Sequence, residues 1–136
     1  MAQSLTVVNT AKKLDFGGTG RGVRRLKLSW VSASDGSVNL TFPCPGGMLI
    51  RVTTVPSGVS APTANYDITI LDPDTSADIL EGTGADRSAS ATETVYPLES
   101  GAPVSTYMYP GDHSLVIANA GDTKAGDIYL DLIEPN

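Results

Sequence analysis

The sequence contains very few of the residues that carry enzyme chemistry or covalent cross-links. Cys44 is the only cysteine among 136 residues, and His113 is the only histidine. A single cysteine excludes an intrachain disulfide, which fits a reducing compartment. Aromatic residues make up 6% of the chain, and no apolar run approaches the roughly 18 residues of a membrane-spanning helix. The opening residues also lack a charged segment followed by an apolar stretch. The sequence therefore predicts no signal peptide and a soluble protein made in the cytoplasm.

Charge is distributed unevenly along the chain. The net charge is −6, yet residues 1–51 hold seven of the nine basic residues and only two of the fifteen acidic ones. Such a basic segment indicates either a nucleic-acid arm or a surface that meets an acidic protein. The segment has little aromatic interleaving for base stacking, and Arg25 and Lys27 alternate with apolar residues as on the wet face of a strand. We therefore expect a protein partner and no nucleic acid. The residues expected to contact that partner are Lys12, Lys13, Arg21, Arg24 and Arg25.

Apolar residues alternate with polar ones through most of the chain, in short runs cut by glycine and proline. Strands are expected at 23–31, 38–42, 48–55, 66–71, 79–80, 93–98, 105–109, 113–119 and 127–133. About nine short strands at roughly ten-residue spacing, without a helical stripe, predict an all-β, antiparallel β-sandwich or jelly roll. We expect this single domain to span residues 21–136. Residues 1–20, which end in a glycine-rich stretch, are expected to form an extended N-terminal arm or an edge segment.

Turn residues between the expected strands predict two hairpins. Asp35-Gly36 favours a tight turn that makes residues 23–42 a hairpin. Turn residues from 119 to 126 favour a closing hairpin of the last two strands. The main helical alternative is 88–94, where alanine and serine are dense. The faces of the strands predict that the following residues lie in or near the core: Leu26, Leu28, Trp30, Val38, Leu40, Ile50, Val52, Ile68, Ile70, Val116, Ile128, Leu130 and Leu132.

The order of several segments resembles that in a known group of proteins. GVRRLKLSWVSASDGSV, LIRVTTVPSG, YDITILDPD and LVIANAGDTKAGDIYLDL follow one another between Gly22 and Ile133. With SAPTANYDITILDPD followed by DILEGTGADRSASATETVYPL, this order resembles small structural virion proteins of tailed bacteriophages, some of which are capsid cement or decoration proteins. The resemblance implies a β-rich unit on the capsid surface, bound to the major capsid protein as a homotrimer. None of the segments is a catalytic signature, so we expect no enzyme and no cofactor.

Three local features invite a chemical interpretation, and each has a structural one beside it. Asp72, Asp74 and Asp78 cluster as calcium ligands do, but their spacing fails the helix–loop–helix pattern, and Asp-Pro-Asp is also ordinary turn chemistry. His113 lies at the start of a strand beside an aspartate that points to the opposite face, so we expect a surface histidine rather than a catalytic one. Cys44 has no nearby base and is expected to be inert. The sequence thus predicts no catalytic residue and no metal site.

Two other functions are compatible with the sequence. The first is a head-to-tail connector, tail or fibre-associated protein, which differs from a shell protein in its copy number. The second is a carbohydrate-binding module, since Tyr96, Tyr107, Tyr109 and Tyr129 could line a sugar platform. Tyr107 and Tyr109 lie two residues apart, on one face of a strand. Protein interfaces are enriched in the same kind of aromatic pair.

Overall fold

The structure is a computed structural model that describes residues 2–13, 22–99 and 102–134. Its strands are β1 (Ser4–Lys13), β2 (Gly22–Val31), β3 (Val38–Cys44), β4 (Gly47–Pro56), β5 (Asp67–Leu71), β6 (Glu93–Val95), β7 (Leu98–Glu99), β8 (Ala102–Pro103), β9 (Thr106–Met108), β10 (Gly111–Ala118) and β11 (Ala125–Ile133). These ranges contain no helix, so none that could cross a membrane. The helical alternative for 88–94 is wrong.

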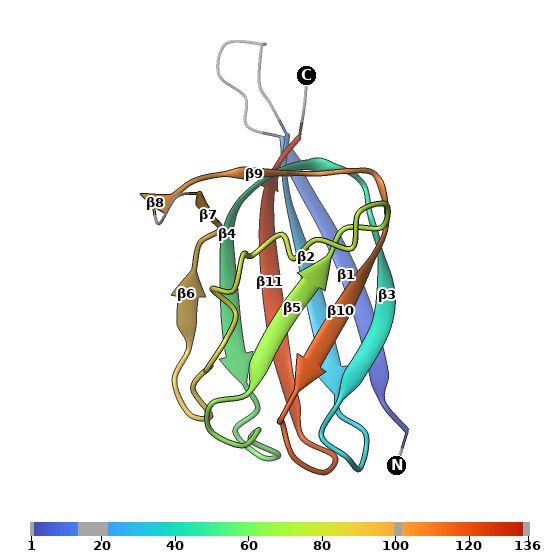
Figure 1. Cartoon of the computed structure of the whole chain (residues 1–136). Helices are drawn as coiled ribbons and strands as arrows, with labels where there is room; N and C mark the ends of the chain where they lie inside the picture. The colour runs from blue at the N-terminus through green and yellow to red at the C-terminus, as the bar shows by residue number, and fades with distance from the viewer. Residues whose placement is uncertain (1, 14–21, 100–101, 135–136) are drawn as a thin grey trace.

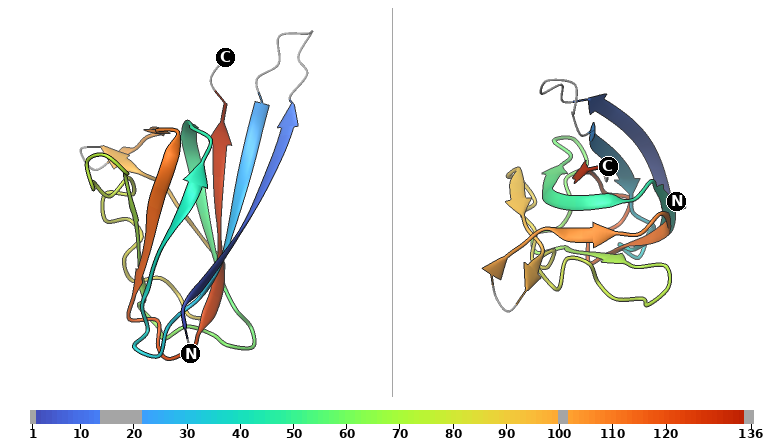
Figure 2. Two further views of the ribbon diagram at one scale, coloured as in Figure 1. Left: turned by 90° about the vertical axis from the view of Figure 1, so that its right-hand side faces the viewer. Right: turned by 90° about the horizontal axis from the view of Figure 1, so that it is seen from above.

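Two antiparallel sheets pack face to face (Figure 1). Sheet A has the strand order β1-β2-β11-β4-β6, and β9 also pairs with β4. Sheet B has the order β3-β10-β5, and β7 and β8 form a small separate pair. Figure 2 shows the two layers from the side and from above. The predicted all-β antiparallel sandwich is confirmed.

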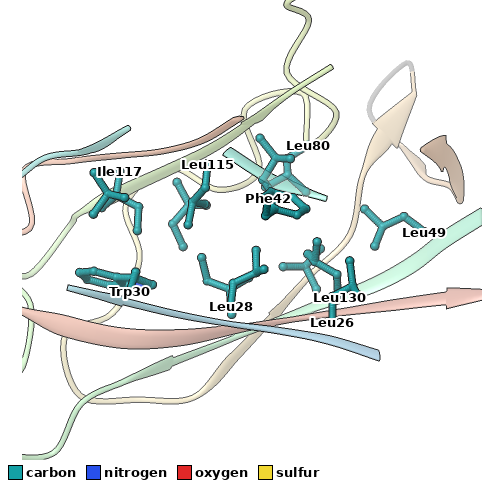
Figure 3. Packing of buried hydrophobic residues seen from close by; sticks show 14 of the residues in the cluster. Leu26, Leu28, Trp30, Phe42, Leu49, Leu80, Leu115, Ile117 and Leu130 are labelled. Carbon is teal, nitrogen blue, oxygen red and sulfur yellow. The ribbon is translucent and has the colours of Figure 1, made fainter. Parts of the chain in front are cut away.

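The core lies between the two sheets and follows from the period-two alternation. In sheet A, Leu28 pairs with Ile128 and Leu26 with Leu130, and all four side chains are buried. Sheet B supplies the opposite wall of the core with Phe42, Leu115 and Ile117 (Figure 3). Burying each large apolar side chain stabilises the fold by about 1.5–3 kcal/mol. The core therefore rests on the alternation that the sequence shows.

Ile50 is not a core residue, contrary to the sequence prediction. Leu49 pairs with Leu132 and Arg51 with Asp131, so Ile50 is the extra residue of a β-bulge. A bulge adds one residue to one strand and shifts the alternation that follows it. Ile50 is consequently 37% exposed, while Leu49 is buried.

Val116 also differs from the prediction, whereas Leu40 lies near the core as expected. Val116 is half-buried on the outer side of sheet B, because Leu115 and Ile117 occupy the inner face of β10. Leu40 is half-buried and packs against the core from β3. The remaining ten predicted core residues are buried.

The two predicted hairpins are wrong, because each turn joins strands of different sheets. β2 pairs with β1 and β11, whereas β3 pairs with β10. The turns after β2 and β10 are therefore arches between the layers, and they are bonded to each other. Ser32 N–H donates to Lys124 O at 2.8 Å, and Ala120 N–H donates to Gly36 O at 3.0 Å. A tight turn such as Asp35-Gly36 reverses the chain, but long-range pairing decides which sheet receives it.

Residues 4–13 form an edge strand rather than a detached arm. β1 pairs with β2 over its whole length, from Ser4 opposite Val31 to Lys13 opposite Gly22. Leu5 and Val7 pack against the core from this strand. Of the two forms expected for residues 1–20, the structure thus contains the edge segment over 4–13, and residues 14–20 lie outside the described ranges.

An irregular segment covers the free edge of β5. Ile79 N–H donates to Ile70 O at 2.9 Å, and Ile68 N–H donates to Gly84 O at 2.9 Å. Leu80, which this segment carries, is fully buried in the core (Figure 3). The chain then continues to β6 at the edge of sheet A. The segment between β5 and β6 therefore connects the edge of sheet B to the edge of sheet A (Figure 1).

Candidate interaction surface

One row of residues crosses the upper end of sheet A as drawn in Figure 1. Lys12 pairs with Val23, Val23 with Ile133, Ile133 with Met48, and Met48 with Tyr107. The row therefore joins β1, β2, β11, β4 and β9. It brings the basic end of β1 and the tyrosines of the β9 region to the same end of one sheet, although about 95 residues separate them in the sequence.

Large apolar side chains are exposed at the β9 end of this row. Met48 is 40% exposed, and Tyr107 and Tyr109 are 45% and 60% exposed. The rings of Tyr107 and Tyr109 lie 5.5 Å apart at an interplanar angle of 49°. We call Met48, Ile50, Tyr96, Tyr107 and Tyr109 the aromatic end surface. Exposed tyrosine and methionine are typical of protein interfaces. Tyrosine supplies contact area with few rotatable bonds, and methionine adapts its shape to the partner.

Tyr96 and Ile50 join this surface through the register of β4. Tyr96 directly follows Val95, the partner of Val52, and Ile50 is the bulged residue two positions before Val52. Both are exposed. The sequence pattern missed Ile50 because it assigned this residue to the core. The uninterrupted apolar run from Met48 to Ile50 was the one available signal of a bulge.

Arg25, one of the predicted contact residues, is bound within the chain. Its Nε and Nη2 donate to the two carboxylate oxygens of Asp131 at 2.6 and 3.1 Å. This hydrogen bonding raises the pKa of Arg25 above its ordinary value. Arg51 lies 3.7 Å from the same carboxylate, and the guanidinium of Arg25 lies 5.2 Å from the ring centre of Tyr129. The charge of Arg25 is therefore paired with Asp131 and Tyr129 on the outer face of sheet A.

Arg24 is also bound within the chain. Its Nη1 donates to Asn9 Oδ1 at 2.7 Å, and its Nη2 forms an ion pair with Glu134. Lys12 and Lys13 are the last two residues of β1. Arg21 lies outside the described residues. Among the five predicted contact residues, Arg24 and Arg25 therefore tie β2 to its neighbours, and the two lysines lie at the row end.

The carboxylates of Asp72 and Asp78 accept hydrogen bonds from backbone groups of their own turn. Asp72 Oδ1 accepts from the N–H groups of Asp74 and Thr75 at 2.9 and 3.0 Å, and these bonds lower the pKa of Asp72. Asp78 accepts from Leu80 and Gly82 N–H. Within the described ranges, no three His, Cys, Asp or Glu side chains come together as metal ligands. Asp72 and Asp78 thus have the turn chemistry that was the alternative to calcium binding.

A cleft adjoins the same turn. It has a volume of about 300 Å³ and is lined on one side by Asp72 and Asp78 and on the other by Leu98, Val104 and Ser105. The described residues that line it supply carboxylates, hydroxyls and apolar groups but no histidine, cysteine, lysine or arginine. The described lining of the cleft therefore does not combine a carboxylate with a basic side chain.

His113 is buried, so the prediction of a surface histidine is wrong. It pairs with Phe42 across β3 and β10, and the two rings stack with centroids 5.9 Å apart. The side chain shares the inner face of β10 with Leu115 and Ile117. Its Nδ1 lies 3.3 Å from Gly111 O, and its Nε2 has no hydrogen-bond partner in the described part of the chain. His113 is buried because the alternation of β10 places it on the same face as Leu115 and Ile117.

Cys44 is buried at the end of β3, as expected for an inert thiol. Its sulfur accepts a hydrogen bond from Gly46 N–H at 3.4 Å. Burial raises the pKa of the thiol, which lowers the fraction of the nucleophilic thiolate.

No protein-family model matches the chain, and no curated protein matches it.

Proposed function

We propose that this chain is a structural virion protein of a tailed phage. It acts as a capsid cement or decoration protein, which binds the outer shell and bridges neighbouring subunits of the major capsid protein without catalysing a reaction. On the shell it associates as a homotrimer. The resemblance of its segments to phage structural proteins supports this assignment. The observation that carries it is the row from Lys12 to Tyr107, which combines a basic end with the aromatic end surface on one sheet.

The two halves of this row have different physical roles in docking. The lysines steer the encounter with an acidic shell surface, an attraction that salt screens over about 10 Å. The aromatic end surface supplies the apolar contact that slows dissociation. Arg24 and Arg25 contribute little to steering, because Glu134 and Asp131 already neutralise them.

The test is a titration of purified protein onto undecorated particles. Deleting residues 1–20 would remove β1 and uncover the edge of β2, so point substitutions are the cleaner choice. A Lys12→Glu/Lys13→Glu variant should bind more weakly and lose most of its dependence on salt. Tyr107→Ala should lower affinity roughly fivefold or more at every salt concentration, as truncation of an interface anchor does.

Lys124→Glu and Val59→Ala are the matched controls. Lys124 lies in the turn after β10, at the opposite end of the sandwich, and Val59 is a fully exposed loop residue. Both controls should bind as the unchanged protein does. Equal binding of all the variants, with circular dichroism showing the same fold, would contradict the proposal.

Copy number separates the shell protein from a connector, tail or fibre-associated protein. A cement protein occurs in hundreds of copies on a particle, whereas a connector position holds about a dozen or fewer. Quantitative mass spectrometry of purified virions would therefore distinguish these locations.

A carbohydrate-binding module is the second candidate function, supported by the exposed pair Tyr107 and Tyr109. Because their planes are inclined by 49°, the two rings do not form one flat platform, and a sugar would stack on only one of them. A glycan array with wild-type protein and a Tyr109→Ala variant tests this function. Binding of one glycan class that the variant loses would favour it.

A further inference from the structure

β1 is the one long sheet edge that the described part of the chain leaves uncovered. Its ten residues pair with β2 on one side, and no described strand pairs with the other side. It contains no proline, glycine or bulge. An edge of this kind presents a row of free N–H and C=O groups that can template another strand.

The other described edges are covered, shortened or interrupted, whereas β1 has only Lys12 and Lys13 at its end as edge charges. The segment through Ile79 and Gly84 covers the edge of β5. β3 contains Pro43, and the side chain of Gln3 accepts from its Asn39 N–H. On the far side of sheet A, β4 is covered by β6 and β9, and each of these has only three residues. The difference marks β1 as an edge left available for pairing.

We propose that β1 is a self-association edge, which pairs antiparallel with β1 of a second copy across a two-fold axis. The two A sheets then continue into one another. The occupant is a second copy because an equally long free edge, with identical spacing, exists on every copy. This contact goes beyond the proposed function, since it needs no shell. On a shell, the same contact would join subunits of neighbouring trimers.

Charge decides the direction of pairing. In a parallel pair, Lys12 and Lys13 of both copies would lie side by side about 5 Å apart. In an antiparallel pair centred on Val8, the two Lys12 residues are separated by eight residue positions, or about 26 Å, which exceeds the screening length of about 8 Å at physiological salt. β1 contains no acidic residue that could compensate the parallel arrangement.

The exposure of Val8 selects the register. Val8 pairs with Lys27, lies in the middle of β1 and is 50% exposed. A two-fold axis perpendicular to the sheet keeps inward residues opposite inward ones, so it must pass midway between the two copies of one β1 residue. Placing it at Val8 sets the two valines against each other and pairs Thr6 with Thr10. This register covers the exposed β-branched side chain with its own copy.

The experiment is sedimentation of the purified full chain over micromolar to millimolar concentrations, without particles. The unchanged protein should form a dimer of roughly micromolar affinity, because a single-edge contact lies at the small end of interface sizes. Val8→Lys should raise the dissociation constant at least about tenfold, since like charges directly opposite one another destabilise a strand pair. Val8→Glu should have the same effect.

The decisive sample is an equal mixture of the two variants. Lysine from one copy then faces glutamate from the other, so a one-to-one heterodimer should form at concentrations where each variant alone is mainly monomeric. Val59→Lys, the same substitution at a loop residue that is 98% exposed, should leave the dimer unchanged. A monomeric wild type, or variants that dimerise like the wild type, would overturn the inference. Recovery of dimers in the mixture also excludes misfolding as the cause of dissociation.

Discussion

Tyr66 lies in the core immediately before β5 and is 1% exposed, with its ring centre 5.6 Å from that of Trp30. Burial, together with the nearby negative charge of Glu93, raises the pKa of Tyr66 to about 12. In the unfolded chain a tyrosine ionises near pH 10. The neutral phenol is therefore favoured by folding, and its contribution is present below pH 10 and lost as the pH rises towards 12.

Tyr66→Phe should remove this dependence on pH. The free energy of unfolding of the wild type should fall by about 2 kcal/mol between pH 10 and 12 through this group, because one pKa unit corresponds to about 1.4 kcal/mol. Urea unfolding at several alkaline pH values measures the slope of the free energy of unfolding against pH. Tyr96→Phe, at an exposed position, is the matched control and should keep the wild-type slope. Identical slopes for wild type and Tyr66→Phe would show that Tyr66 ionises freely in the fold.

Cys44 should react with a thiol reagent only when the fold opens. Its burial raises the thiol pKa and shields the sulfur, so both the thiolate fraction and the access of the reagent are low. At pH 8 a chromogenic disulfide reagent should label the native protein slowly and label the urea-unfolded protein completely within minutes. Fast stoichiometric labelling without denaturant would mean that the end of β3 is open.

At the scale of elements, Gly84 permits the close approach of the covering segment to β5. A Cβ atom at this position would lie 2.1 Å from Ile68 O and 3.0 Å from Ile68 C. Ile68 N–H is bonded to Gly84 O, so neither β5 nor the covering segment can move away without losing that bond. Gly84→Ala should lower the free energy of unfolding by about 1–3 kcal/mol, as overpacking does.

Gly58→Ala is the matched control for that substitution. Its added Cβ would meet no described atom within 4 Å. The change should therefore be neutral or stabilise the protein by about 0.4–1 kcal/mol, because it reduces the freedom of the unfolded chain. Chemical denaturation of both variants checks the pair, and equal stabilities would refute the close approach at Gly84.

At the scale of the whole molecule, the two sheets share one core and are tied by the two bonded arches. Trp30, the only tryptophan, projects from sheet A and lies beside Tyr66 at the start of β5. Its fluorescence therefore reports the packing of the layers, while far-ultraviolet circular dichroism reports the strands. We expect both signals to change at one midpoint in urea, as in a two-state transition. Separate midpoints would mean that one sheet outlasts the other.

The sequence alone determined the class of the fold and most of the core. Alternation in β2 and β11 identified Leu26, Leu28, Leu130 and Leu132 as inward residues, because the period of a strand is a local property. The aspartates of the 72–78 turn were also readable as turn residues, since they bond to their own backbone neighbours. The pair Tyr107 and Tyr109 could also be recognised, because residues two positions apart lie on the same face of a strand.

Only the tertiary structure decided which strands pair and what each pairing exposes. Asp35-Gly36 is compatible with a hairpin or an arch, and the choice lies with β11, which is about 90 residues away in sequence. The bulge at Ile50 shifts the exposed side of β4, and the inner face of β10 buries His113. The row from Lys12 to Tyr107 likewise exists only in the register of five strands. Each of these features depends on contacts between segments that are distant in the sequence. The free energies of those contacts cannot be read from a local sequence pattern.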